Sequence, residues 1–119
     1  MRLDHVQLAV PPGAETQCRA FYCGLLGWTE LPKPVALAGR GGLWLDAGAC
    51  QVHLGVEADF RPALKAHPAF AVEDLDGLAQ SLRAAGHAVD FDEAIPGRRR
   101  FYTADAVGNR LEFLEAQTQ

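Results

Sequence analysis

An internal repeat is the feature that most constrains how this chain can fold. The segment His5–Val10 (HVQLAV) returns 62 residues later as residues 67–72 (HPAFAV), and each copy begins with histidine and ends in Ala-Val. A second echo relates residues 52–57 to residues 111–115 and aligns His53 with Glu112, at an offset of 59 residues. Two echoes at nearly equal offsets indicate a structural unit of about half the chain that is present twice.

The first half of the chain shows the pattern of one helix among several strands. Residues 3–10 alternate at strand period, with Val6, Leu8 and Val10 on one face and His5, Gln7 and Ala9 on the other. The helical spacing of apolar residues predicts a helix from about residue 15 to residue 26, which Gly27 ends. Short strands are expected at 28–31, 43–46 and 51–56, with a flexible turn at 39–42, so this half reads β-α-β-β-β.

The second half repeats this order. A strand at 67–72 precedes a helix whose first turn is acidic and which Gly86 ends, and strands follow near 88–91, 100–104 and 110–115. We therefore predict an α+β domain over residues 1–119, made of two βαβββ modules at about 1–57 and 67–116. The two modules are expected to form an open, curved mixed sheet around a cleft.

Composition and charge narrow the class of partner. The chain is 49% hydrophobic and 22% charged, which is ordinary for a soluble globular domain, and its net charge of −4 argues against nucleic-acid binding. The sequence shows neither a secretory signal nor an apolar run of membrane-span length. Cys18, Cys23 and Cys50 lack metal or redox spacing and are expected to be reduced. These features predict a cytoplasmic protein, and the net charge does not exclude a small anionic ligand.

A set of potential metal ligands lies on the predicted strands. His5, His53, His67 and Glu112 are expected on the strand faces opposite the helices, where they would line the cleft. Imidazole and carboxylate groups suit a divalent Zn, Ni, Co, Mn or Fe(II) ion, and three or four such ligands would leave positions for substrate. A single strand histidine is more often a hydrogen-bonded structural residue, but the repeat places several on one face and favours metal binding.

Four segments together resemble one known superfamily over essentially the whole chain. They are residues 3–10 (LDHVQLAV), residues 21–28 (FYCGLLGW), the repeated strand with His67, and residues 105–113 (DAVGNRLEF). The chain is similar to members of the vicinal-oxygen-chelate superfamily, which includes glyoxalase I, bleomycin-resistance proteins, fosfomycin-resistance enzymes and extradiol dioxygenases. Ala106 and Val107 stand where the family usually has Pro and Asp.

The resemblance implies a metal triad of His5, His67 and Glu112. His53 matches a fourth ligand position that is commonly Glu in glyoxalase I, so carboxylate-base chemistry there is in doubt. The implied mechanism is chelation of two substrate oxygens by the metal, with Glu112 or His53 moving protons. The resemblance also implies a homodimer, with the cleft formed either within one chain or across two.

Four further residues are expected to contact substrate. Gln7 shares the predicted cleft face with His5, and Trp44 would line an apolar pocket, although a core position is its alternative. Arg100 and Tyr102 follow the basic run that begins at Arg98, which would attract a phosphate or carboxylate unless it is only a solvated loop.

Several activities share this scaffold. The reading favoured by the resemblance is a metal-dependent glyoxalase-type lyase or isomerase that acts on a small oxygen-chelating substrate such as a thiol adduct. The alternatives are a bleomycin-resistance-type binding protein without catalysis and a fosfomycin-type thiol transferase. An iron(II) extradiol dioxygenase would normally have a longer chain.

Overall fold

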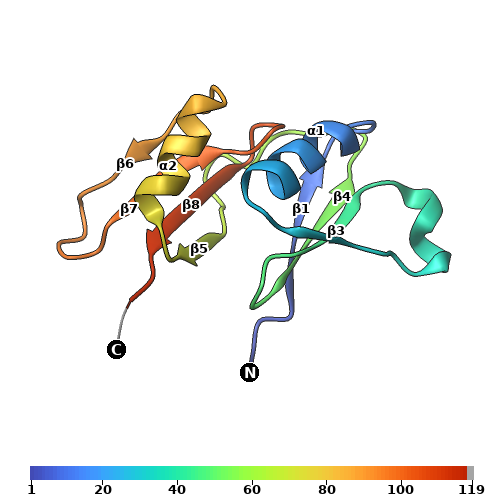
Figure 1. Cartoon of the computed structure of the whole chain (residues 1–119). Helices are drawn as coiled ribbons and strands as arrows, with labels where there is room; N and C mark the ends of the chain where they lie inside the picture. Colours follow the sequence, from blue (N-terminus) through green and yellow to red (C-terminus); the bar gives the residue numbers. More distant parts are fainter. Residues whose placement is uncertain (118–119) are drawn as a thin grey trace. The chain divides into compact units, whose positions relative to one another are not determined.

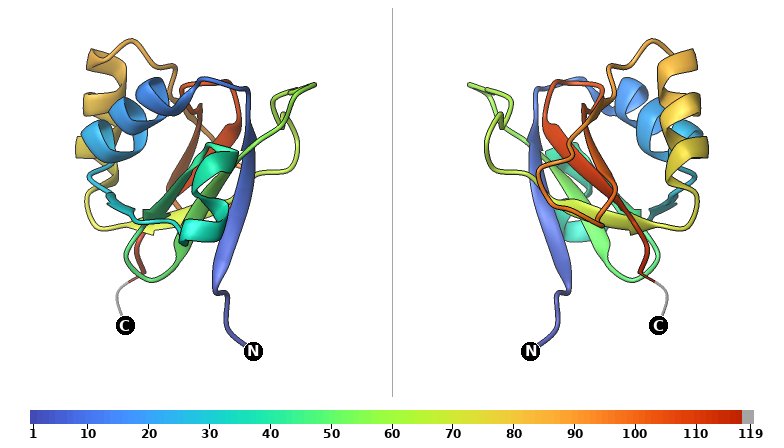
Figure 2. Two further views of the ribbon diagram at one scale, coloured as in Figure 1. Left: turned by 90° about the vertical axis from the view of Figure 1, so that its right-hand side faces the viewer. Right: turned by 90° about the vertical axis from the view of Figure 1, so that its left-hand side faces the viewer.

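The chain is organised as two compact units, each built on its own sheet. The computed structural model describes residues 1–117 and divides into Met1–Pro62, here called module 1, and module 2, which begins at Ala63. Each module contains a four-stranded sheet of parallel and antiparallel strands (Figure 1). In each, a helix lies against one face of the sheet (Figure 2). The α+β class with open mixed sheets, predicted from the sequence, is confirmed.

Module 1 follows the predicted order, with one additional helical segment between its second and third strands. Its elements are β1 (His5–Val10), α1 (Glu15–Arg19), η1 (Ala20–Leu25), β2 (Thr29–Leu31), η2 (Val35–Arg40), β3 (Leu43–Asp46) and β4 (Gln51–Val56). The strands lie in the order β1-β4-β3-β2, with β1 parallel to β4.

Module 2 repeats this arrangement with shorter edge strands. Its elements are β5 (Ala69–Val72), α2 (Leu75–Ala84), β6 (Asp90–Phe91), β7 (Arg100–Ala104) and β8 (Arg110–Glu115). Their order is β5-β8-β7-β6, with β5 parallel to β8. The strand predicted at 67–72 begins only at Ala69, so His67 precedes it, and the strand predicted at 88–91 is shortened to two residues.

The strand register confirms the internal repeat. Gln7 pairs with His53 in module 1, and Ala69 pairs with Glu112 in module 2, so the two pairs are related by the 62- and 59-residue offsets of the sequence. Trp44 lies opposite His53, and Tyr102 lies opposite Glu112. His53 and Glu112 are therefore equivalent positions, and so are Trp44 and Tyr102.

The helical run of module 1 changes its hydrogen bonding partway. An α-helix was expected over 15–26, but from Ala20 the turns widen into a π-helix, and the Leu26 N–H donates to the Phe21 carbonyl five residues back at 3.1 Å. The widening accompanies burial of two adjacent rings, Phe21 and Tyr22. Gly27 ends the run at φ 75°, as predicted.

The buried apolar side chains lie mainly on the sheet faces that the helices cover. In module 2 four phenylalanines, one from each strand, form a row of neighbouring rings with centroids 5.4 to 5.7 Å apart. This row consists of Phe70, Phe113, Phe101 and Phe91, of which Phe113 and Phe101 are fully buried and Phe91, on the edge strand, is 37% exposed. Helix α2 begins at the Asp74 cap, whose carboxylate accepts from the Gly77 N–H at 2.9 Å, and buries Leu75, Ala79 and Leu82.

The segment before β3 is more ordered than expected. In place of a flexible turn at 39–42, a 3₁₀ helix covers Val35–Arg40 and is followed by Gly41 and Gly42, both at positive φ. A Cβ on Gly42 would lie 2.0 Å from the Leu54 carbonyl oxygen, so only glycine allows this approach to β4. The Gly42 N–H also donates to the Glu15 carboxylate at 2.8 Å, which fixes the segment to the start of α1.

The structure bears on two expectations from the sequence, the state of the cysteines and the presence of a membrane-spanning helix. The three cysteines are free thiols, with Cys18 buried and the other two half-buried. Over the described part of the chain, no helix has the length and apolar character that crossing a membrane requires.

Candidate functional site

The face of the module 1 sheet opposite its helix carries three stacked rings. His53 of β4 stands between His5 of β1 and Trp44 of β3, with ring centroids 4.2 and 4.1 Å away and interplanar angles of 13° and 7°. Gln7 shares this face and lies over Gly55, where a Cβ would come within 2.6 Å of its amide nitrogen. The predicted grouping of these side chains is therefore present, and Trp44 is half-buried on this face rather than in the core.

Hydrogen-bond partners indicate which ring nitrogens carry a proton. The His5 Nδ1 atom lies 2.8 Å from the Asp4 carboxylate, which can only accept, so Nδ1 donates and Nε2 keeps its lone pair. In His53 it is Nε2 that has a partner, the Gln51 side-chain oxygen at 2.9 Å, which leaves Nδ1 with the lone pair. The two stacked histidines therefore differ in the nitrogen that carries the lone pair, which is Nε2 in His5 and Nδ1 in His53.

Burial sets the electrostatics of His53. Its side chain is buried between the other two rings, and the loss of water lowers the pKa of His53 below the ordinary value of 6.5. The charge of the neighbouring His5 lowers this pKa further, whereas the Asp4 carboxylate raises it. His53 is therefore a neutral imidazole at pH 7, which is the form that binds a metal or accepts a proton.

The equivalent face of module 2 carries an ionic group in place of the stack. His67 Nε2 lies 3.0 Å from Glu112 Oε1, and the second carboxylate oxygen lies 3.4 Å from Arg100 Nη1. Arg100 also donates to the Tyr102 hydroxyl at 2.8 Å, and the Arg110 guanidinium lies 3.9 Å from the centre of the Tyr102 ring. Glu112 and Arg100 are largely buried, with 8% and 13% of their side chains exposed.

The orientation of His67 limits how it can contact Glu112. His67 Nδ1 lies 2.7 Å from the Lys65 carbonyl oxygen, to which it must donate, so Nε2 faces the carboxylate oxygen either as the N–H of an imidazolium, in an ion pair, or with a lone pair. Such a contact is favourable only if a proton or another cation is shared by the two groups. Neutral imidazole with a carboxylate, oriented by a second hydrogen bond at the far ring nitrogen, is a common donor set for divalent ions.

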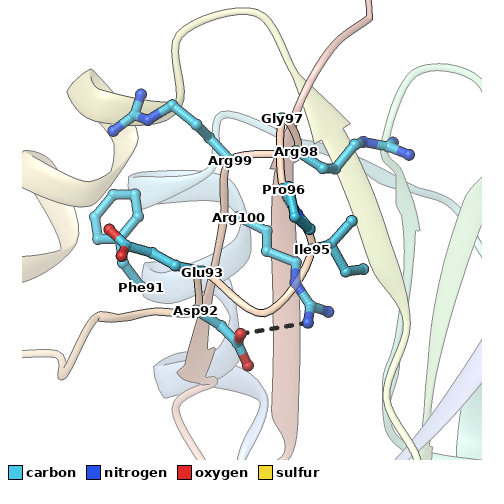
Figure 3. Close-up of a pocket in the computed structure, with 9 residues that line it drawn as sticks. All are labelled: Phe91, Asp92, Glu93, Ile95, Pro96, Gly97, Arg98, Arg99 and Arg100. Carbon is cyan, nitrogen blue, oxygen red and sulfur yellow. Dashed lines mark ion pairs between the residues drawn. The ribbon is translucent and has the colours of Figure 1, made fainter.

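The basic run at 98–100 is divided among different partners. Arg99 forms a two-bond contact with Asp76 of α2, at 2.8 and 2.9 Å, while Arg100 lies 3.5 Å from Asp92. Figure 3 shows Arg98 and Arg99 extending in opposite directions from the loop between β6 and β7, with the Arg100–Asp92 ion pair beneath them. Arg99 therefore already has an acidic partner, which α2 supplies.

Asp105 and Asn109 form a structural clamp that the sequence reasoning did not identify. Asp105 accepts from the backbone N–H of Val107 and Asn109, at 3.0 and 2.9 Å, and Asn109 Oδ1 accepts from the Ala63 N–H at 3.0 Å. The Arg110 N–H donates to the Ala63 carbonyl at 2.8 Å. Ala63 is four residues before His67, and Asn109 is three before Glu112, so this clamp sets the position of one ligand candidate relative to the other. The Asp105-to-Glu112 motif contained the signal, because buried Asp and Asn that flank a turn are typical caps.

The eight predicted site residues thus separate into two groups of four. Module 1 brings together His5, Gln7, Trp44 and His53, and module 2 brings together His67, Arg100, Tyr102 and Glu112. Within residues 1–117, no three side chains of His, Cys, Asp or Glu are grouped so that they could hold a metal ion. Neither module alone therefore supplies a complete ligand set.

Comparison with known proteins agrees with this architecture. The closely similar crystal structure of a glyoxalase family protein from Bacillus anthracis is 46% identical, with a TM-score of 0.94, and the match covers 98% of this chain and 96% of that one. Lactoylglutathione lyase from Agrobacterium tumefaciens is 18% identical, with a TM-score of 0.73 and coverage of 96% and 92%. A variant of the fosfomycin resistance protein FosX from Listeria monocytogenes, in complex with Mn(II) and 1S,2S-dihydroxypropylphosphonic acid, is 16% identical, with a TM-score of 0.79 and coverage of 97% and 92%.

The likeness to the lyase and to FosX shows the shared fold alone, whereas the family follows from the whole sequence. No protein with a curated function matches the sequence. The model of the Glyoxalase/Bleomycin resistance protein/Dioxygenase superfamily matches residues 2–113. The chain therefore belongs to this superfamily, as the motifs at its two ends and in its repeated strand predicted.

Proposed function

We propose that this protein is a metal-dependent glyoxalase-type lyase or isomerase whose substrate is a small molecule that chelates through two oxygens, such as a thiol adduct. The observation that carries the proposal is the His67–Glu112 contact, in which Nε2 and Oε1 lie 3.0 Å apart while the far ring nitrogen donates to the Lys65 carbonyl. A divalent cation held by both groups would take the place of the proton that this contact otherwise needs, and would make the two groups a ligand pair.

His5 is the third proposed ligand. Its Asp4 partner leaves Nε2 as the lone-pair atom, as the Lys65 carbonyl does for His67, so both histidines of the repeat are oriented alike. His53 would bind as a fourth ligand only through Nδ1, because Gln51 engages Nε2. Since neither module holds three ligands, the proposal requires donors from both, contributed by one chain or by the two chains of a homodimer.

The donor set suits Zn, Ni, Co, Mn or Fe(II), and the FosX variant described above was crystallised with Mn(II). When bound, such an ion would supply Lewis-acid polarisation of a substrate oxygen. Glu112 and His53 are the proposed proton carriers, the first as a carboxylate held by Arg100 and the second as a buried neutral imidazole. Gln7, Trp44, Arg100 and Tyr102 are the proposed substrate contacts, and the proposed compartment is the cytoplasm.

Metal analysis of the full chain tests the proposal. Protein purified without chelator is analysed by elemental mass spectrometry beside His5→Ala, Glu112→Ala and His87→Ala, the last a control histidine outside both groups. We expect roughly one divalent ion per chain in the wild type and in His87→Ala, and loss of the ion in the other two variants. A positive result justifies assays with 2-oxoaldehyde–thiol adducts and with fosfomycin.

The opposite result favours a different function. If the wild type takes up no metal after incubation with nickel, zinc, manganese and iron(II), the enzyme proposal fails as stated. The histidines would then be polar lining of a site that binds a small molecule without catalysis, as in the bleomycin-resistance members of the superfamily.

A further inference from the structure

A pocket on module 1 extends beyond the stacked rings to the segment that precedes β3. It has a volume of about 550 Å³, and its floor is formed by side chains of β1, β3 and β4, including His5, His53 and Trp44. One wall is the segment 33–41, which contributes Lys33, Leu37, Arg40 and Gly41. None of these wall residues takes part in the proposed function.

The charged groups that line this pocket are mainly cationic. Lys33 and Arg40 are both part of the lining, and the single acidic residue there, Asp4, accepts a hydrogen bond from His5. The Lys33 ammonium donates to the Gly41 carbonyl and makes no ion pair among the described residues, although the Glu15 carboxylate, which accepts from the Gly42 N–H, lies near enough for Lys33 to lower its pKa. In the part of the chain that the structure describes, Arg40 forms no ion pair.

The cationic wall is held in place by the fold. Gly42 is hydrogen-bonded to Glu15 and closely packed on Leu54, and the Lys33 bond to Gly41 connects the two ends of the segment. The backbone of the wall and the Lys33 ammonium are therefore held at the pocket before any ligand arrives, which lowers the entropic cost of binding.

We propose that this pocket binds an anionic oxygen group of the substrate, a carboxylate or a phosphonate or phosphate, through Lys33 and Arg40. The inference rests on the proposed function in one respect, since the same molecule would present its chelating oxygens at His5. Arginine offers a planar pair of donors to such a group, and lysine adds a mobile point charge. Because the whole chain carries a net charge of −4, attraction of an anion must come from local cations of this kind.

The test compares Lys33→Met and Arg40→Met with Arg61→Met, a control that removes one exposed positive charge of module 1 outside the pocket. The probes are methylphosphonate, acetate and the neutral diol 1,2-propanediol, added to the full chain as purified. Binding is followed by the ring C–H resonances of His5 and His53 and by tryptophan fluorescence, with Trp44→Phe to assign the fluorescence change. Thermal unfolding of each variant confirms that it is folded.

We expect at least one of the two anions to bind the wild type and Arg61→Met with equal affinity, while the diol does not bind. Each pocket variant should lower the affinity for that anion on the order of 10-fold, because each removes one charge-assisted hydrogen bond. Arg40→Lys should restore part of the loss. Preference for methylphosphonate or for acetate then distinguishes a phosphorus oxyanion from a carboxylate.

Metal content, measured on the same samples, separates this inference from the proposed function. If no sample contains metal but binding of the anion still requires Lys33 and Arg40, the anion site stands and the metal proposal fails. If metal is present and the anion binds all variants equally, the anion site is wrong and the metal proposal stands. Absence of binding by both anions at tens of millimolar would also overturn the inference.

Discussion

The two modules have the same strand order and register, but the side chains on the sheet face opposite the helix differ. At the central position of that face, module 1 has His53, which stacks between His5 and Trp44, and module 2 has Glu112, which joins His67 to Arg100. One exchange of imidazole for carboxylate accompanies the change from a stack of rings to an ion-paired group. The comparison shows that the two modules have the same backbone register while the side chains at equivalent positions have different partners.

The modules also differ in how each ligand candidate is held. His5 is oriented by a side chain, the exposed Asp4, whereas His67 is oriented by the backbone carbonyl of Lys65. In module 2 the clamp of Asp105 and Asn109 adds a buried connection between the chain before His67 and the start of β8. Loss of a buried polar side chain of this clamp in module 2 should therefore lower stability more than loss of an exposed hydrogen-bonding side chain in module 1.

The largest effect is expected from Asn109→Ala. Asn109 is 2% exposed, and its truncation removes both the acceptor of the part-buried Ala63 N–H and the hydrogen bond from its side-chain amide to Asp105. We expect the free energy of unfolding to fall by about 2 kcal/mol or more. The measurement is denaturant unfolding of the full chain.

Asp46→Ala in module 1 is the matched control for this prediction. Asp46 also accepts from a turn N–H, that of Gly48 at 2.8 Å, but this hydrogen bond is exposed. The expected loss is below about 1 kcal/mol. Equal losses in the two variants would contradict the proposed difference between the modules.

The next effect concerns metal affinity and rests on the proposed function. Asp4→Asn removes the charged acceptor that orients His5. Loss of a hydrogen-bond partner of a metal ligand typically lowers metal affinity by about 10- to 100-fold. Competition with a coloured chelator measures the change, with Asp46→Asn as the control. Unchanged affinity in Asp4→Asn would mean that Asp4 does not support a metal ligand.

A smaller effect should appear in the pH dependence of module 1. The pKa of His53 is lowered by burial, so below the ordinary value of 6.5 the unfolded chain binds a proton that the folded chain resists. The free energy of unfolding should therefore decrease as the pH falls below about 6.5, whereas His53 makes no such contribution above that pH.

NMR titration of the His53 ring measures its pKa directly. In Trp44→Ala the ring loses one stacked neighbour and becomes more exposed to water, so the pKa of His53 should move back toward 6.5. A pKa of His53 at or above 6.5 in the wild type would contradict the burial argument.

The repeat explains how much of this arrangement could be predicted from the sequence. The equivalence of Gln7 with Ala69, and of His53 with Glu112, follows the two echoes, because the two modules have the same strand register. The alternation in residues 3–10 likewise placed His5 and Gln7 on one face. Strand periodicity and duplication were sufficient for these features.

Contacts between elements distant in sequence could not be predicted in this way. Neither the bond between Glu15 and Gly42 nor the contact between Asp76 and Arg99 has a local pattern, since each depends on how a helix lies over its sheet. The widening of the helix from Ala20 onward has no clear composition signal either. The stack of His5, His53 and Trp44 required the strand order β1-β4-β3, which periodicity alone does not give.

The smallest effect is expected from Arg99→Ala, beside the buried Arg100. The hydrogen bonds of Arg99 lower the pKa of Asp76, so this pair contributes at neutral pH and loses its contribution as the pH falls below the ordinary Asp value of 3.8. Both side chains are highly exposed, at 47% and 70%, so water and salt screen the pair and its loss should leave the thermal midpoint almost unchanged. Arg100→Met should lower the midpoint clearly, because Glu112 would keep a buried carboxylate without its cation. Equal midpoints for the two variants would show that burial does not distinguish these adjacent arginines.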